Sequence, residues 1–196
     1  MTSEFPGRDE LIHALDTAVG AGDTDSVMRA LRSALCDSIQ SGDVRLPDCV
    51  FEGCAGHYAR RELYRSREHG YCVIAMTWNP GQGTPIHDHA GLWCVEGVWH
   101  GALEVVQYEL HEHDDVRYRF VSAGAIQAGV GSAGSLIPPH EHHSIRNASD
   151  RELAISVHVY QDCMTHCNVF EPDHDDWYLR REHQLHLDNN PAVGVH

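Results

Sequence analysis

His87 and His89, separated by one residue, are the side chains whose type and spacing point most directly to chemistry. On a β-strand, residues i and i+2 face the same side with Cα atoms about 6.5–7 Å apart. Two imidazoles that close can bind one metal ion at about 2.0–2.2 Å per bond, while Asp88 faces the other side. The preceding Gly83-Thr84-Pro85 supplies a tight bend that orients the pair. We therefore interpret this segment as half of a metal site.

The same His-x-His spacing occurs twice more, which limits what it indicates by itself. His111-Glu112-His113 precedes two aspartates, Asp114 and Asp115, and is typical of an acidic turn in solvent. His140-Glu141-His142 lies directly before another candidate ligand, His143. Each pair taken alone is more often structural than metal-binding, so the surrounding residues must decide.

Composition argues against two classes of partner. The 196 residues include 29 acidic and 14 basic side chains, a formal net charge of −15, and 17 histidines. A strongly negative surface repels phosphate backbones and anionic lipids, so we expect neither nucleic acid nor a membrane as partner. Neutral histidines offer nitrogen lone pairs to a metal. The oligomeric state stays open.

Cysteine usage indicates a reducing environment. The seven cysteines are odd in number and irregularly spaced, and the first residues lack a basic stretch followed by an apolar run. We therefore expect a cytoplasmic protein with free thiols rather than a disulfide scaffold.

Hydrophobic periodicity predicts two helices and then many short strands. The first helix runs from Arg8 to the Gly20-Ala21-Gly22 break, and the second begins after Asp23 or Thr24 and ends at Ser41-Gly42. Strand-like runs follow at residues 71–78, 92–99, 103–110, 116–121 and 153–160. This pattern is typical of a sandwich or barrel. We expect residues 1–52 to pack as a helical segment on a β-domain of residues 53–196, whose C-terminal extension wraps the barrel.

The histidine motif resembles the first signature of the cupin superfamily, in which glycine is followed by His-x-His, glutamate and glycine. The second signature, a proline-led turn, a histidine and an asparagine four residues later, is matched by Pro138, His143 and Asn147. This register makes His143 the third ligand in preference to the adjacent His-Glu-His run. The resemblance covers roughly residues 57–171 and implies a mainly β cupin barrel (a double-stranded β-helix, jelly-roll-like).

The departure from the general cupin pattern is informative. Cys94 stands where most cupins carry a metal-binding glutamate, and Glu96 is two residues out of register. Three neutral imidazoles leave a divalent iron at +2, which favours an anionic ligand such as a substrate thiolate. This pattern resembles the thiol dioxygenases, and within them the cysteine dioxygenase family. The resemblance implies Fe(II) held by His87, His89 and His143.

Ser156-Val157-His158-Val159-Tyr160 resembles the family's Ser-x-His-x-Tyr strand, whose three alternate residues share one face. The resemblance implies that Ser156, His158 and Tyr160 form a hydrogen-bonded relay that ends beside the iron. Cys94 matches a cysteine that is linked to this tyrosine by a thioether in eukaryotic members, whereas many bacterial relatives have glycine. Cys94 as an ordinary buried thiol is the alternative.

Tyr58-Ala59-Arg60 resembles the element that grips the substrate carboxylate in cysteine-specific members. The planar arginine fork suits a carboxylate because it donates two charge-assisted hydrogen bonds. Members that use 3-mercaptopropionate generally have glutamine there, so Arg60 favours cysteine, with Arg61 as the alternative. Cys167 matches a cysteine that lines the pocket. Gln161-Asp162-Cys163 replaces prolines that are common in the family, so the resemblance predicts neither the shape of the pocket rim nor the choice of substrate.

The resemblance implies addition of both atoms of O₂ to the sulfur of a small thiol, with L-cysteine favoured and cysteine sulfinic acid as product. One alternative is a dioxygenase for 3-mercaptopropionate, mercaptosuccinate or another mercapto acid. The other is a non-catalytic metal-binding cupin that acts as a sensor or structural module.

Overall fold

Two α-helices, a short 3₁₀-helix and eleven strands form the secondary structure of residues 4–188, the part of the chain that the computed structural model describes. The helices are α1 (Arg8–Val19), α2 (Thr24–Ser41) and η1 (Asp48–Phe51). The strands are β1 (Ala59–Arg65), β2 (Cys72–Trp78), β3 (Ile86–His87), β4 (Cys94–His100), β5 (Ala102–His113), β6 (Arg117–Gly129), β7 (Ala133–Leu136), β8 (His143–Asn147), β9 (Ala154–Tyr160), β10 (His166–Pro172) and β11 (Trp177–Gln184).

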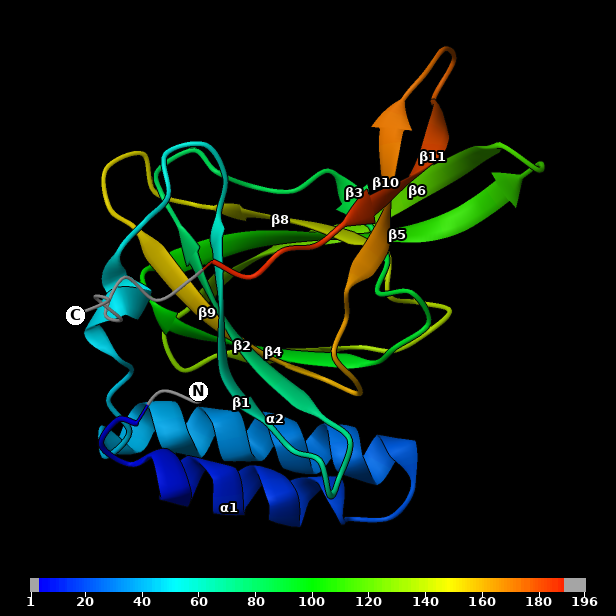
Figure 1. The fold of residues 1–196 in the computed structure, drawn as a ribbon. Helices are drawn as coiled ribbons and strands as arrows, with labels where there is room; N and C mark the ends of the chain where they lie inside the picture. Colours follow the sequence, from blue (N-terminus) through cyan, green and yellow to red (C-terminus); the bar gives the residue numbers. More distant parts are fainter. Residues whose placement is uncertain (1–3, 189–196) are drawn as a thin grey trace.

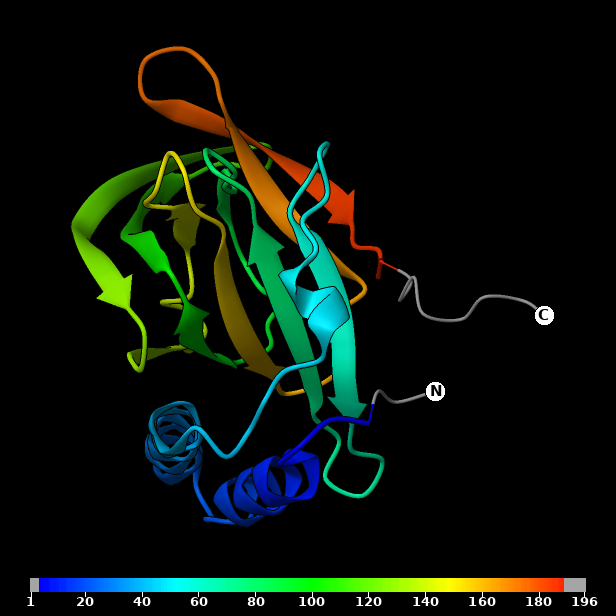
Figure 2. The ribbon, with the colours of Figure 1, turned by 90° about the vertical axis from the view of Figure 1, so that its left-hand side faces the viewer.

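The two predicted helices are confirmed, and their ends have the expected causes. The Asp23 carboxylate caps α2 by accepting a 2.9 Å hydrogen bond from the backbone N–H of Ser26. Gly42 ends the helix with a left-handed φ of 73°. Both helices bury an apolar stripe, which includes Leu15 in α1 and Leu31 in α2. Figures 1 and 2 show the pair lying side by side against one face of the barrel.

The strands form two sheets that enclose the barrel interior. One has the order β1-β2-β9-β4-β7, and the other, β10-β11-β6-β5-β8-β3, closes on itself. Strands β2 and β9 are buried on both faces. Along β2, Val73 and Ala75 pack in the cluster that contains the helices, whereas Ile74 and Met76 pack in the barrel interior. The mainly β barrel with two N-terminal helices is the fold class expected from the sequence, although the boundary at residue 52 stays a prediction.

Two segments that the sequence predicts as turns or breaks between strands belong to strands. The acidic turn expected at residues 111–113 is wrong, because β5 continues to His113 and the chain reverses at Asp114, whose side chain accepts from the N–H of Val116 and of Arg117. The break expected at residues 122–124 lies inside β6, where a bulge takes up the extra residue and Gly124 has a φ of 140°.

Much of the predicted C-terminal wrap is a regular strand. Strand β11 pairs antiparallel with β10 over most of its length and with β6 near its start. Beyond it, the backbone N–H of Asp188 donates to the carbonyl of Arg60, which brings the segment after β11 against β1. Residues 189–196 of the predicted extension lie outside the described residues.

Candidate metal centre and its pocket

Three histidines distant in sequence meet at one point of the barrel interior. His87 of β3 and His143 of β8 are direct cross-strand partners, and their ring centroids lie 4.3 Å apart. The ring of His89 lies 5.5 Å from that of His87 and 5.1 Å from that of His143. One ligand atom from each residue lies within 4.8 Å of the other two. His89 and His143 are each only 1% exposed.

The structure corrects how His89 is positioned. The sequence predicts that one strand carries both His87 and His89, but β3 ends at His87, and His89 lies in the following turn. Asp88 holds this turn, because its carboxylate accepts hydrogen bonds from the N–H of Ala90 and from both the backbone and side-chain nitrogens of Asn168 in β10. The Asp88 carboxylate is thus held by the turn and by β10.

Hydrogen bonds assign the ring tautomers of two of these histidines. Nδ1 of His87 lies 3.2 Å from the carbonyl oxygen of Pro85, and Nδ1 of His143 lies 2.8 Å from that of Glu141. A carbonyl only accepts, so each Nδ1 carries the proton and each Nε2 keeps its lone pair. Nδ1 of His89 is buried without a hydrogen-bond partner among the described residues.

Burial keeps all three rings uncharged. It lowers the pKa of His87 to about 4, and it is the main cause that lowers the pKa of His89 and of His143 well below its usual value. Repulsion between neighbouring rings, if they were protonated, acts in the same direction. Three neutral imidazoles with converging nitrogens form a donor set that suits a divalent transition metal. The residues present therefore fit a mononuclear metal ion.

The predicted relay residues lie together on β9. Ser156, His158 and Tyr160 are buried and face the barrel interior. The Oγ atom of Ser156 lies 2.8 Å from Nε2 of His158, and Nδ1 of His158 lies 3.4 Å from the hydroxyl oxygen of Tyr160.

Trp78 of β2 extends this chain of hydrogen bonds. Its indole N–H donates to Ser156 Oγ at 2.9 Å, and an indole N–H can only donate. The Ser156 hydroxyl is then free to donate to His158 Nε2. In that tautomer the proton of His158 is on Nδ1, the nitrogen that faces Tyr160 and Glu96. No motif spacing marks Trp78, because its contact with β9 depends on the pairing of β2 with that strand.

Cys94 lies beside Tyr160, as the resemblance implies. The two residues are direct partners across β4 and β9, and the Cys94 thiol is fully buried. Burial raises the pKa of both side chains well above their usual values, so both are protonated at neutral pH. Glu96, two residues along β4, is not part of the group formed by the three candidate metal ligands. Its carboxylate lies instead 3.3 Å from Nδ1 of His158.

Arg60, and not Arg61, faces the histidine pocket. Arg61 extends toward Thr77 and the carbonyl of Glu52, to which it donates at 3.3 and 2.8 Å. Arg60 is 5% exposed, its Nε has no hydrogen-bond partner, and no carboxylate of residues 4–188 forms an ion pair with it. Tyr58 lines the same pocket and stacks on Trp78 with ring centroids 4.4 Å apart.

The pocket bounded by these groups is small. Its lining surrounds about 330 Å³ of space not filled by atoms, of which the centre of a water molecule can occupy about 20 Å³. Cys167 of β10 lines it, as predicted, and burial raises the pKa of that thiol to about 11. Met164 and Leu185 also line it, although neither carries a motif. The lining residues are Tyr58, Arg60, Met76, Trp78, Thr84, His87, His89, His143, Ile145, His158, Tyr160, Met164, Cys167 and Leu185.

Solved structures similar in fold are distant. They include TT1209 from Thermus thermophilus (TM-score 0.42, 19% identity, 59% of this chain and 94% of that one). An uncharacterized conserved protein with a double-stranded β-helix domain from Klebsiella pneumoniae gives a TM-score of 0.45 at 18% identity, over 59% and 83% of the two chains. A Cupin 2 conserved barrel domain protein from Salinispora arenicola gives 0.43 at 17% identity, over 61% and 87%. These likenesses are too distant to indicate a function.

Within residues 4–188, neither helix combines the length and apolar character needed to cross a bilayer.

The sequence itself gives the stronger comparison. The family model described as cysteine dioxygenase type I matches residues 57–173. That range covers more than half of the chain and contains the three histidines, the β9 relay, Cys94, Arg60 and Cys167. The chain therefore belongs to the cysteine dioxygenase type I family of the cupin superfamily.

Proposed function

We propose that this protein is an Fe(II)-dependent thiol dioxygenase that adds both atoms of O₂ to the sulfur of a small thiol. L-Cysteine is the favoured substrate and cysteine sulfinic acid the product. One observation carries the proposal: three uncharged imidazoles and a guanidinium without an ion-pair partner among the described residues face the same small pocket.

His87, His89 and His143 would hold the metal. The Nδ1 protons of His87 and His143 are bound by backbone carbonyls, which aims each Nε2 lone pair away from the backbone. All three ligands are neutral, so an anionic sulfur is favoured beside them, and a thiol loses its proton on binding. Bound Fe(II) would supply the redox chemistry that O₂ addition requires.

Arg60 and Tyr58 would bind the carboxylate of the substrate. The Arg60 guanidinium is buried beside the histidines, and a substrate carboxylate would give it the ionic partner that residues 4–188 do not supply. Burial raises the pKa of Tyr58, so its hydroxyl stays protonated and can donate a second hydrogen bond. A carboxylate held at this end of a small thiol orients the sulfur toward the histidines, which lowers the entropic part of the barrier.

Tyr160 would donate to the substrate inside the pocket. Its buried hydroxyl stays protonated and accepts from Nδ1 of His158 in the assigned tautomer, which leaves its own proton for the pocket. Ser156 and Trp78 fix the ring of His158 from the other side. The enclosed pocket excludes water, which strengthens each of these polar contacts.

Oxygen consumption with a panel of thiols tests the proposed activity. The Fe(II)-loaded protein is expected to consume O₂ with L-cysteine faster than with 3-mercaptopropionate, because the resemblance assigns arginine at the position of Arg60 to members that use cysteine. It should also use L-cysteine faster than mercaptosuccinate, which is larger and carries a second carboxylate. Mass spectrometry after turnover in isotopically labelled O₂ should find both labelled atoms in the sulfinate. A preference for one of the other acids would change the substrate, and no thiol-dependent uptake with any of them would leave the protein as a non-catalytic cupin.

The Arg60→Gln variant tests the carboxylate clamp. We expect kcat/KM for L-cysteine to fall about a hundredfold, since two charge-assisted hydrogen bonds together contribute about 3 kcal/mol. Use of cysteamine, which has no carboxylate, should stay within about threefold. Arg67→Gln, at an exposed position in the turn between β1 and β2, is the matched control. Equal losses with both thiols would remove Arg60 from the clamp.

Direct pairing of Cys94 with Tyr160 predicts a thioether after turnover. Intact-protein mass spectrometry of the iron-loaded protein, incubated with L-cysteine and O₂, should show a species lighter by two hydrogens. Cys94→Gly and Tyr160→Phe should each abolish that species, because each removes one partner of the bond. An unshifted mass in the unaltered protein, or a deficit that persists in either variant, would contradict the assignment.

A further inference from the structure

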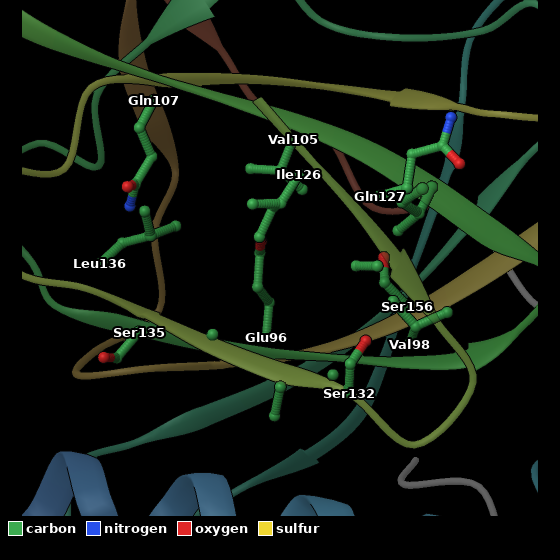
Figure 3. A pocket seen from close by; sticks show the side chains of 15 residues that line it. Glu96, Val98, Val105, Gln107, Ile126, Gln127, Ser132, Ser135, Leu136 and Ser156 are labelled. Carbon is green, nitrogen blue, oxygen red and sulfur yellow. The ribbon is translucent and has the colours of Figure 1, made fainter. Parts of the chain in front are cut away.

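A second cavity occupies the other part of the barrel interior. The centre of a water molecule can occupy about 200 Å³ of it, against about 20 Å³ of the histidine pocket. Strands β4, β5, β6 and β7 supply most of its walls (Figure 3). Val98, Leu103 and Leu136 form buried apolar surface in it, whereas Ile126 and Gln127 lie at its exposed rim. A cavity of this size admits a small organic molecule rather than single waters.

One ionisable group lies in this wall, whose other members are apolar residues, serines and glutamines. Of the fifteen described residues that line the cavity, Glu96 alone is ionisable. In Figure 3 its side chain points from β4 into the space between β4 and the β5–β6 hairpin. Glu96 is 9% exposed, and its Oε2 has no hydrogen-bond partner among the described residues.

No cation among the described residues compensates this carboxylate. Nδ1 of His158 is 3.3 Å from Oε2 of Glu96, but burial lowers the pKa of His158 to about 3, so this ring is neutral. Burial alone raises the pKa of Glu96 to about 7. Glu96 is thus partly ionised at neutral pH, and its contact at ion-pair distance is with the uncharged ring of His158, which forms no aligned hydrogen bond to Oε2. A positively charged occupant of the cavity would stabilise the ionised form.

Gly134 leaves the space beside the carboxylate open. It is the direct partner of Glu96 across β4 and β7, and a Cβ atom added to it would meet nothing within 4 Å. Its φ is not among the positive values of the chain, so the backbone does not require glycine here. Neither the backbone conformation nor close packing therefore requires glycine at this position, and the absence of a side chain leaves space beside Glu96.

From these contacts we infer that the cavity binds a small organic cation, namely a primary alkylammonium. Its nitrogen would pair with the Glu96 carboxylate, and its short chain would contact Val98, Leu103 and Leu136. A divalent metal ion fits less well, because the lining holds a single carboxylate and its other oxygen-bearing side chains are neutral serines and glutamines. The cavity shares no lining residue with the histidine pocket, although Glu96 and Ser156 contact His158, which lies between the two. Binding of the cation does not depend on the proposed dioxygenase activity.

Isothermal titration calorimetry with three probes of one shape tests the site. n-Butylammonium should bind the purified protein with one-to-one stoichiometry and at least about tenfold more tightly than 1-butanol, because a charge-assisted hydrogen bond is worth about 1.5–3 kcal/mol. n-Butyrate should not bind, since its charge repels Glu96. The readout involves neither a thiol nor turnover, so its failure would leave the dioxygenase proposal untouched.

Two sets of variants test the charge of Glu96 and the volume of the cavity separately. Glu96→Gln keeps the side-chain shape and should abolish the preference for butylammonium over butanol. Gly134→Val should fill the cavity and weaken both probes, whereas Gly129→Val is the matched control, because its added side chain also meets nothing within 4 Å but lies outside the cavity lining. Thermal unfolding verifies that each variant is folded. The inference is wrong if butylammonium does not bind, if it binds Glu96→Gln equally well, or if both valine variants behave alike.

Discussion

Three imidazole rings can be buried in contact only while they carry no charge, and the pocket of this protein is built around that constraint. The cross-strand pair His87 and His143 brings two rings together, and the turn held by Asp88 adds His89. Backbone carbonyls fix the proton of two rings on Nδ1. Protonation of one ring would place a cation among the other donors, so burial both keeps the rings neutral and prepares them for a metal.

The sheet that carries the relay is supported on both sides. Strands β2 and β9 are buried on both faces, with helix-side residues such as Val157 alternating with pocket residues such as His158. The N-terminal helices thus contribute no group to the pocket but cover the outer face of the sheet from which Trp78, Ser156 and Tyr160 project. Rigid strands position polar groups more accurately than loops do, which suits a relay whose hydrogen bonds depend on one ring orientation.

The helices and the many-stranded barrel could be predicted because helical and strand periodicity carry a physical signal, whereas the grouping of His143 with His87 and His89 came from the resemblance to the cupin signatures. The sequence was insufficient wherever tertiary pairing decides. His89 lies in a turn because β3 is only two residues long, and the choice between Arg60 and Arg61 depends on which face of β1 meets the pocket. The role of Trp78 and the cavity beside Glu96 follow from partners on other strands, which no local pattern reveals. The thiol that is used, and the ligand roles of the histidines, stay predictions.

Iron content per subunit of histidine variants tests the central claim most directly. After anaerobic loading with Fe(II) and removal of excess metal, the unaltered protein should hold one iron per subunit, and His87→Ala and His143→Ala should hold almost none. His111→Ala, an exposed member of another His-x-His pair, should bind iron normally. Circular dichroism verifies that the variants are folded. Full iron content in His87→Ala or His143→Ala would contradict the account, because the buried imidazoles would then not be what holds the metal.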